Sequence, residues 1–392
     1  MTCGSKGHLY LEKLQETALA RAGRLGDQPK QWLLDFDLDN IPDRAFEGLG
    51  QSSEQIAKAR AGYKREFRCY LKARMPTPFE HPLMYALLLS LCERIEKAAK
   101  RLGTPIHKRP VLGTLMSGRV NAATLAVPSS NDYLVVFEAG LFLFALLLAK
   151  VGVRAFAFQG DEEGKGYGFT FSEDEADVER AVLASPDILR RFQEVVLAYL
   201  LVGEPGRAPQ YFTEGPNALI AGELIDSMEL FVMGHEYAHV FLGHLARSRK
   251  QVGVLAGEEV QEVVYTWQQE FEADLHGCLL MLAAKAEERV DPALSFWGSD
   301  FFFSCVDIIQ RARSIMTSGD ETSLPSTSHP PPAMRREALR QGIADSGSTV
   351  FGESALALGR ALELTLEILW KRTRPHVLKL FEIGKELAPV WR

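Results

Sequence analysis

An apolar run near the middle of the chain, FVMGHEYAHVFLGH at residues 231–244, carries three histidines and one glutamate. Apolar residues recur at helical spacing from about 218 to 247 without an intervening proline, which predicts one long helix. His235 and His239 lie four residues apart, so their side chains share one face of that helix, a turn from each other. This spacing can bring two imidazoles to one metal ion, with Glu236 beside it, where a carboxylate can accept a proton from an attacking water.

A catalytic zinc site also needs a third protein ligand and an open position for water. His244 is one candidate for that ligand, but it follows His235 one residue short of the metzincin spacing HExxHxxGxxH. On an unbroken helix this separation is a rotation of roughly 900°, which places His244 on the face opposite His235. We therefore interpret His244 as a surface histidine or one with a secondary role.

A second candidate ligand is Glu270, in the stretch WQQEFEADLHG of a helix predicted from about 256 to 287. Glu270 and Asp274 are four residues apart, so the glutamate can bind zinc while the aspartate accepts a hydrogen bond from a zinc-binding imidazole. Glu272 is the alternative carboxylate ligand, but the residue four positions after it is His276, not an acid that could orient a ligand histidine. A solvated helix face is the expected environment of Glu272.

Composition and charge argue against several classes of function. The 392 residues have a net charge of −7 and a pI near 5.8, whereas a nucleic-acid binder needs a basic face to neutralise phosphates. The five cysteines form no CxxC pair, so a reducing compartment is expected and a thiolate zinc site is not. No secretory signal is recognisable, and the most apolar run, 139–149, is well short of the ~20 residues that span a bilayer. We expect a cytoplasmic protein without a membrane span, and a buried helix at 139–149.

The remaining segments are assigned by periodicity and by turn residues. The acidic, glycine-rich segment 159–180 is expected to be a solvated loop, since it lacks the Gly-x-x-x-x-Gly-Lys-Ser/Thr of a phosphate-binding loop. We predict helices over 83–103, 292–316 and 352–390, a β-hairpin over 119–137, and a loop over the Ser- and Pro-rich 317–335.

Four stretches together resemble the HtpX and CAAX prenyl protease type of gluzincin zinc metallopeptidase. They are HExxH at 235–239, EFEAD at 270–274, the hairpin RVNAATLAVPSSNDYLVVFEAGL at 119–141, and TSHPPPAMR at 327–335. The hairpin and the His-Pro-Pro segment are weak signals individually, whereas the four in the family's order are specific. The resemblance covers about residues 85–340.

This resemblance implies an α+β, mainly α, zincin-like fold, with a small β-sheet whose edge strand binds substrate and a helix that carries HExxH. It implies one Zn²⁺ per chain. The ligands would be His235, His239 and Glu270, with Asp274 orienting a ligand histidine and Glu236 acting as the general base.

The resemblance also implies roles for the hairpin and the downstream segment. The strand from Asn121 to Leu125, including Ala122 and Ala123, would pair with an extended substrate peptide by strand addition. His329 and Arg335 would lie near the zinc and stabilise the developing oxyanion. The expected organisation is a helical region of unknown role at 1–76, a metallopeptidase domain at 77–345 with an insertion at about 150–217, and a helical segment at 346–392.

The sequence departs from the family in that insertion and in having no spanning helix, so prenylated or membrane-protein substrates are not implied. Phage-exclusion-type bacterial zinc proteases, which share HExxH, are a neighbouring possibility. The expected function is a zinc-dependent endopeptidase acting on a protein or peptide. The alternatives are a non-catalytic peptide-binding or regulatory protein on the same scaffold, and a helical interaction protein in which HExxH is accidental. The sequence contains no signal for cleavage specificity or oligomeric state.

Overall fold

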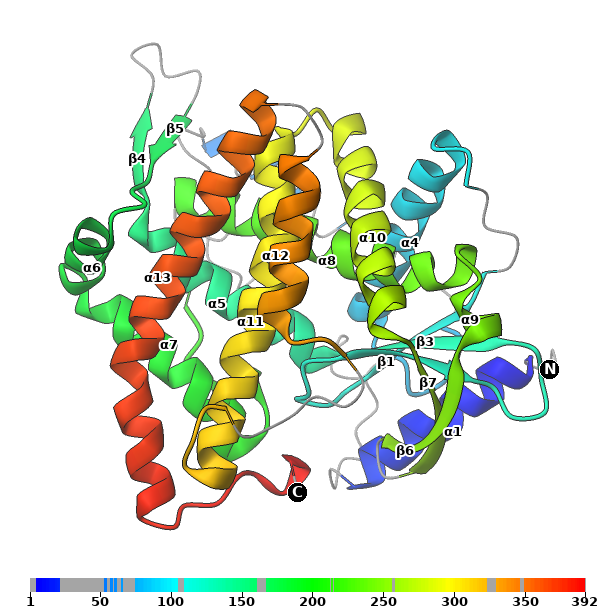
Figure 1. The fold of residues 1–392 in the computed structure, drawn as a ribbon. Coiled ribbons are helices and arrows are strands. Elements are labelled where there is room, and N and C mark those ends of the chain that lie inside the picture. Colours follow the sequence, from blue (N-terminus) through cyan, green and yellow to red (C-terminus); the bar gives the residue numbers. More distant parts are fainter. Residues whose placement is uncertain are drawn as a thin grey trace.

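The computed structural model describes residues 5–21, 75–104, 109–160, 167–211, 213, 215–255, 258–322, 329–345 and 349–391, with single positions or pairs between 53 and 65. These residues form a mainly helical structure with one five-stranded mixed sheet and a separate two-stranded hairpin (Figure 1). This confirms the expected α+β, mainly α class. Of the expected N-terminal region 1–76, residues 22–52 and 66–74 lie outside the described residues.

The five-stranded sheet has the strand order β1-β3-β2-β7-β6. Its strands are β1 (Val111–Leu115), β2 (Ala122–Ala126), β3 (Tyr133–Glu138), β6 (Arg249–Leu255) and β7 (Glu258–Val264). β1 and β3 are parallel, and the other neighbours are antiparallel. β2 and β3 form the predicted hairpin, in which Ala122 lies opposite Phe137 and Ala126 opposite Tyr133.

The strand that was expected to be a free edge is an internal strand. β2 lies between β3 and β7, so the expectation of an edge is wrong for the strand as a whole. Within the described residues, the registered pairing of β2 with β7 is limited to Leu125 opposite Glu262. The start of the strand, residues 121–124, instead borders a cavity.

The segment between the two predicted site helices is also different from the prediction. The first helix ends at Phe241, and Gly243 then takes a left-handed φ of +68° before the short helix α9 (His244–Arg247). Residues 258–264 form β7 rather than the start of a helix, because valines recur along the stretch EEVQEVV and β-branched side chains favour a strand.

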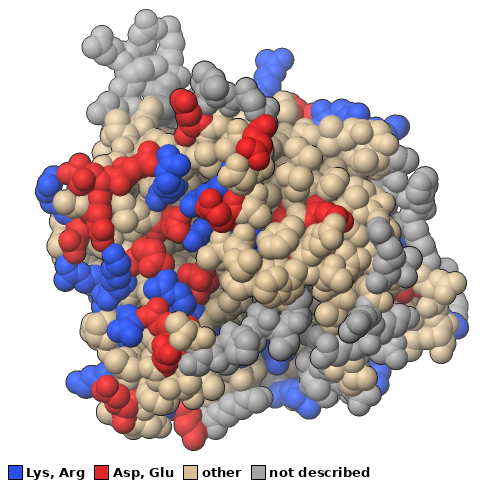
Figure 2. All heavy atoms as spheres, in the orientation of Figure 1, with Lys and Arg blue, Asp and Glu red and all other residues tan. Residues whose placement is uncertain are grey.

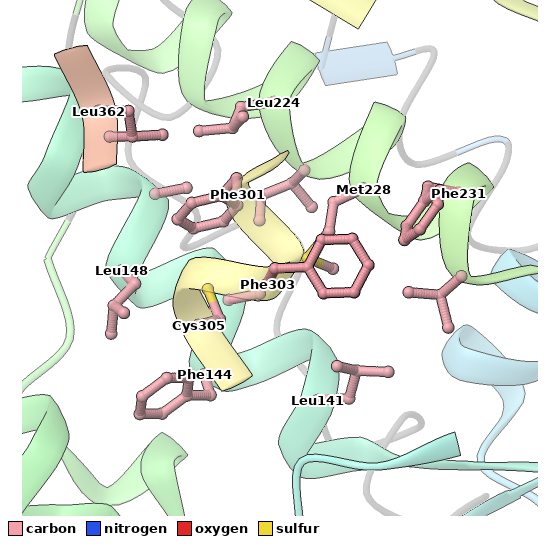
Figure 3. Close-up of a cluster of buried hydrophobic side chains, with 14 of the residues drawn as sticks. Leu141, Phe144, Leu148, Leu224, Met228, Phe231, Phe301, Phe303, Cys305 and Leu362 are labelled. Carbon is pink, nitrogen blue, oxygen red and sulfur yellow. The ribbon is translucent and has the colours of Figure 1, made fainter. Parts of the chain in front are cut away.

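One long helix, α8 (Pro216–Phe241), lies at the centre of the molecule and packs against four others. These are α4 (Pro82–Arg101), α5 (Ala139–Gly152), α10 (Trp267–Glu287) and α11 (Pro292–Ser318). Figure 3 shows part of the core they form, in which Phe144 of α5, Met228 of α8 and Phe301 of α11 are buried. The apolar run 139–149 lies in α5, as predicted. No described helix combines the length and the apolar character that crossing a membrane would require.

The sheet is covered on both faces. α1 (Lys6–Arg21) lies on the face away from α4 and α10 (Figure 1) and buries Leu11 and Leu14 against Leu134 and Val136. The alternate residues of β3, such as Val135, point into the main core, as the two-residue period of a strand requires. The described part of the N-terminal region is thus packed into the same fold.

The expected insertion 150–217 packs against the C-terminal helix. It contains β4 (Ala157–Gly160), β5 (Tyr167–Thr170), α6 (Glu175–Leu183) and α7 (Pro186–Leu197), so the expected loop at 159–180 is partly a hairpin and a helix. Helices α12 (Pro332–Ala344) and α13 (Thr349–Glu382) follow the site region. Figure 2 shows charged side chains gathered over α6 and α13, where Arg360 pairs with Glu173 and Lys371 with Glu175.

Candidate metal centre

Two helices meet backbone to backbone at the site. A Cβ added to Gly277 of α10 would lie 2.6 Å from the backbone N of His235 on α8, and one added to Gly234 would lie 2.8 Å from the carbonyl oxygen of Gly277. Two turns earlier, on the same face, α8 is equally close to α11, since a Cβ at Gly298 would lie 2.5 Å from the backbone N of Met228. These contacts require glycine, and they place the first turn of α10 beside the two histidines.

Three buried side chains converge there, as their spacing predicts. Ligand atoms of His235, His239 and Glu270 all lie within 4.8 Å of one another. The two Nε2 atoms are 3.1 Å apart, and they lie 3.6 Å and 3.8 Å from oxygens of Glu270. Ligands of a tetrahedral zinc ion, at bond lengths of about 2.0–2.2 Å, are separated by roughly 3.3 Å. The group can therefore hold a metal ion of that size.

The environment of Glu270 fits a cation. The residue is fully buried, and among the described residues neither carboxylate oxygen has a hydrogen-bond partner, although Arg335 Nη2 lies 3.3 Å from Oε2. Burial raises its pKa to about 7, although His235 and Arg335 lower it. A buried carboxylate is normally hydrogen-bonded, so one that lacks a hydrogen bond and faces two imidazole nitrogens fits a metal ligand. Its position is fixed by the capping box of Thr266, whose carbonyl accepts a hydrogen bond from the backbone N–H of Glu270.

Asp274 orients the first histidine, as expected. His235 Nδ1 is 2.9 Å from Asp274 Oδ1, which leaves Nε2 facing Glu270. Arg335 donates from Nε and Nη2 to both oxygens of Asp274, at 2.7 and 2.6 Å. Burial raises the pKa of Asp274, but Arg335 and His235 lower it more, so the carboxyl stays ionised. Burial lowers the pKa of His235, but Asp274 raises it above the usual range.

The second histidine, His239, is oriented by His244, which was predicted to lie on the opposite face of the helix. His244 is fully buried, and its Nδ1 lies 3.0 Å from His239 Nδ1. Its Nε2 lies 3.1 Å from Glu272, whose side chain is 41% exposed. The break of the helix at Gly243 turns His244 back toward the site, so the rotation of an unbroken helix does not apply. Burial lowers the pKa of His239 well below its usual range, and the neighbouring histidines lower it further, which favours a neutral imidazole.

Glu236 faces a cavity of about 490 Å³. The hydroxyl of Thr124 on β2 donates a hydrogen bond to its Oε2. Asn121, Ala122 and Ala123 line the same cavity, as do apolar side chains of α8 and α11. The expected substrate-binding residues therefore border the general-base candidate, although β2 is not an edge strand.

The downstream segment also reaches the site. His329 Nε2 is 3.7 Å from Glu270 Oε1, and its side chain is 47% exposed. Arg335 is buried, and two of its three nitrogens are engaged by Asp274. This geometry favours a positioning role for Arg335 over the expected direct contact with an oxyanion.

Sequence reasoning missed Thr124, Tyr265 and the role of His244. Tyr265 stacks on His239 with ring centroids 3.5 Å apart and planes 9° apart. Burial raises the pKa of this phenol, and the neighbouring Glu236 carboxylate raises it further. Gly243 was the available signal for His244, whereas no sequence pattern marks Thr124 or Tyr265. Comparisons of the chain with family models, curated proteins and solved structures find no significant match.

Proposed function

We propose that this protein is a zinc-dependent endopeptidase that hydrolyses a protein or peptide substrate. The observation that carries the proposal is Glu270: a second helix brings a buried carboxylate, without a hydrogen bond among the described residues, to the two imidazole nitrogens of HExxH. The resemblance of the four sequence stretches to HtpX and CAAX protease-type gluzincins supports the same function. Glu236, beside this group and open to a cavity, completes what peptide hydrolysis needs.

A zinc ion held by His235, His239 and Glu270 would polarise the scissile carbonyl and acidify the attacking water. Glu236 then accepts a proton from that water as its oxygen bonds to the carbonyl carbon. The same carboxyl group returns the proton to the amide nitrogen as the C–N bond breaks. The products are a carboxylic acid and an amine, and Glu236 ends in its starting state. Thr124 holds the carboxylate in place through its hydrogen bond.

The cavity suits an extended chain. Asn121 and residues 122–124 of β2 line it, and β2 is paired with β3 on one side, while the registered pairing with β7 is limited to Leu125. Backbone groups at the start of β2 can thus hold a peptide by strand addition over a short length. Phe231, Phe302 and Phe303 supply an apolar wall for a substrate side chain.

The decisive variant is Glu236→Gln, which removes the base but keeps the size of the side chain. We expect it to retain one zinc per chain and the wild-type melting temperature, and to lose nearly all cleavage of an unbiased peptide library read by mass spectrometry. Glu229→Gln is the matched control, since Glu229 is also buried on α8 but does not line the cavity.

Full activity of the Glu236 variant would refute the assignment. A wild-type protein that binds zinc through Glu270 but cleaves nothing would favour the peptide-binding alternative. Absence of zinc from purified protein, unchanged by Glu270→Ala, would favour an accidental HExxH.

A further inference from the structure

Tyr265 lies directly between β7 and α10, and its ring covers one ligand of the candidate metal centre. The parallel stack on His239, with centroids 3.5 Å apart, fixes the ring against an imidazole that is itself held by His244. The residue is 8% exposed and lines the cavity that also contains Glu236. The phenol is therefore placed by the same contacts that place the ligand.

The hydroxyl of Tyr265 is weakly partnered. Its buried Oη makes no hydrogen bond of good geometry among the described residues, and its polar neighbours are the Glu236 carboxylate and the Thr124 hydroxyl, which donates its own proton to Glu236. Leaving a buried hydroxyl without a good hydrogen bond destabilises the fold, so such groups are rare unless a partner arrives with a ligand. Ring stacking alone does not explain this hydroxyl, because phenylalanine would stack as well without the penalty.

We propose that Tyr265 is a further catalytic residue, whose Oη donates a hydrogen bond to the reacting oxygen of the substrate as water adds to the carbonyl. The inference rests on the proposed function. No proton is transferred by Tyr265: Glu236 carries the proton, and the phenol stabilises negative charge as it develops on oxygen. A preorganised donor in a buried site is effective because it needs no reorganisation during the reaction. Arg335 is engaged by Asp274, so Tyr265 would share this task with His329, which lies 3.7 Å from Glu270.

Three variants separate the hydroxyl from the ring. Tyr265→Phe removes only the hydroxyl, and Tyr265→Ala removes the stack on His239 as well. Tyr133→Phe is the matched control, because Tyr133 packs against the same small apolar cluster of Ala126, Val263 and Tyr265 but does not line the cavity. Each variant is compared with the wild type for zinc content, kcat and KM on the best-cleaved library peptide. Each is also tested for its affinity for a phosphinic analogue of that peptide by calorimetry.

We expect Tyr265→Phe to keep its zinc and its KM, to lose about 100-fold in kcat as expected for one oxyanion donor, and to bind the phosphinic analogue at least roughly 10-fold more weakly. Tyr265→Ala should also lose zinc more readily. Tyr133→Phe should match the wild type.

A Tyr265→Phe variant with wild-type kcat and analogue affinity would overturn the proposal, as would a change in KM alone. If the wild type is active and Glu236→Gln is inactive, that result leaves the proposed function intact. If the wild type cleaves nothing, the proposed function fails first, and the role of Tyr265 fails with it.

Discussion

Glu229 is a carboxyl group buried on the helix that carries the two histidines, and it makes folding sensitive to pH. Burial, with a smaller contribution from the charge of Asp226, raises its pKa to about 8 from an ordinary value of 4.5. Between these two values the folded chain keeps a proton that the unfolded chain releases. The free energy of unfolding should therefore fall as the pH rises through this window, by about 1.4 kcal/mol per pH unit from this group.

Glu229→Gln removes this titration while keeping the shape of the side chain. We expect the variant to match the wild type near pH 4.5 and to gain in relative stability as the pH rises toward 8, with no further gain above it. Urea unfolding at a series of pH values measures the difference. Parallel stability curves for the two proteins would show that Glu229 is ionised in the folded state.

At the residue scale, the sequence predicts the three candidate metal ligands but not the residues that orient them. The four-residue spacings of His235 with His239 and of Glu270 with Asp274 suffice to predict the observed group, because helical geometry relates spacing directly to direction. His244 escapes the same argument because it lies beyond a break in the helix. Helical periodicity predicts the direction of a side chain only within a helix, so it does not predict the neighbours of a residue that follows a turn.

At the scale of elements, the site depends on the close approach of α8 and α10. Gly277→Ala adds a Cβ at 2.6 Å from the backbone N of His235, so the helices must separate. We expect a loss of about 1–3 kcal/mol in unfolding free energy, as for overpacking, together with a clear loss of zinc affinity. Thermal unfolding and a zinc titration measure the two effects.

Gly222→Ala is the control for this variant. Gly222 lies on α8, is exposed, and would place a Cβ with no neighbour within 4 Å. Alanine there should stabilise the helix by up to ~1 kcal/mol and leave zinc binding unchanged. Equal zinc affinity in the Gly277 and Gly222 variants would show that helix spacing does not set the geometry of the ligands.

Helices and strands with a clear periodic pattern of apolar residues are predicted well, and those without such a pattern are not. The helix at 292–316 and the hairpin at 119–137 correspond to α11 and to β2 with β3. The short β6–β7 hairpin was predicted in part as helix, since its apolar residues are too few to distinguish the two periods. Its insertion next to β2 is also what makes the expected edge strand internal.

At the scale of the whole molecule, the candidate metal centre joins two long helices of the core, so we expect metal removal to lower overall stability. In the part of the chain that the structure describes, the buried Glu270 carboxylate has no hydrogen-bond partner, and Arg335 lies 3.3 Å from it. We expect EDTA to lower the melting temperature, and added zinc to restore it. If only the folded protein binds zinc, free zinc at 1,000 times its dissociation constant raises the free energy of unfolding by about 4 kcal/mol.

Glu270→Gln is the control for metal removal, because it keeps the volume and removes the charge. Its melting temperature should not respond to EDTA. A wild-type melting curve that is unaffected by EDTA, with zinc shown to have been removed, would mean that the site contributes nothing to the fold.

Long-range packing is the part of the fold that the sequence does not reveal. The segment 150–217 was expected to be an insertion of unknown role, and it packs on α13 through ion pairs such as Arg372 with Glu179. Such pairs join residues nearly two hundred positions apart. Neither the periodicity of apolar residues nor the residues of local turns predicts which distant segments pack against each other.

The glycine contacts have one more consequence, which concerns the choice of ion. α8 meets the backbone of α10 at Gly277 and that of α11 at Gly298, so it can move toward neither neighbour. An ion with longer bonds, such as Ca²⁺ at about 2.3–2.6 Å, would have to part α8 from α10 and, because Gly298 contacts the same face of α8, from α11 as well. We therefore expect helix packing to favour a small ion over a large one, independently of the chemistry of the ligands.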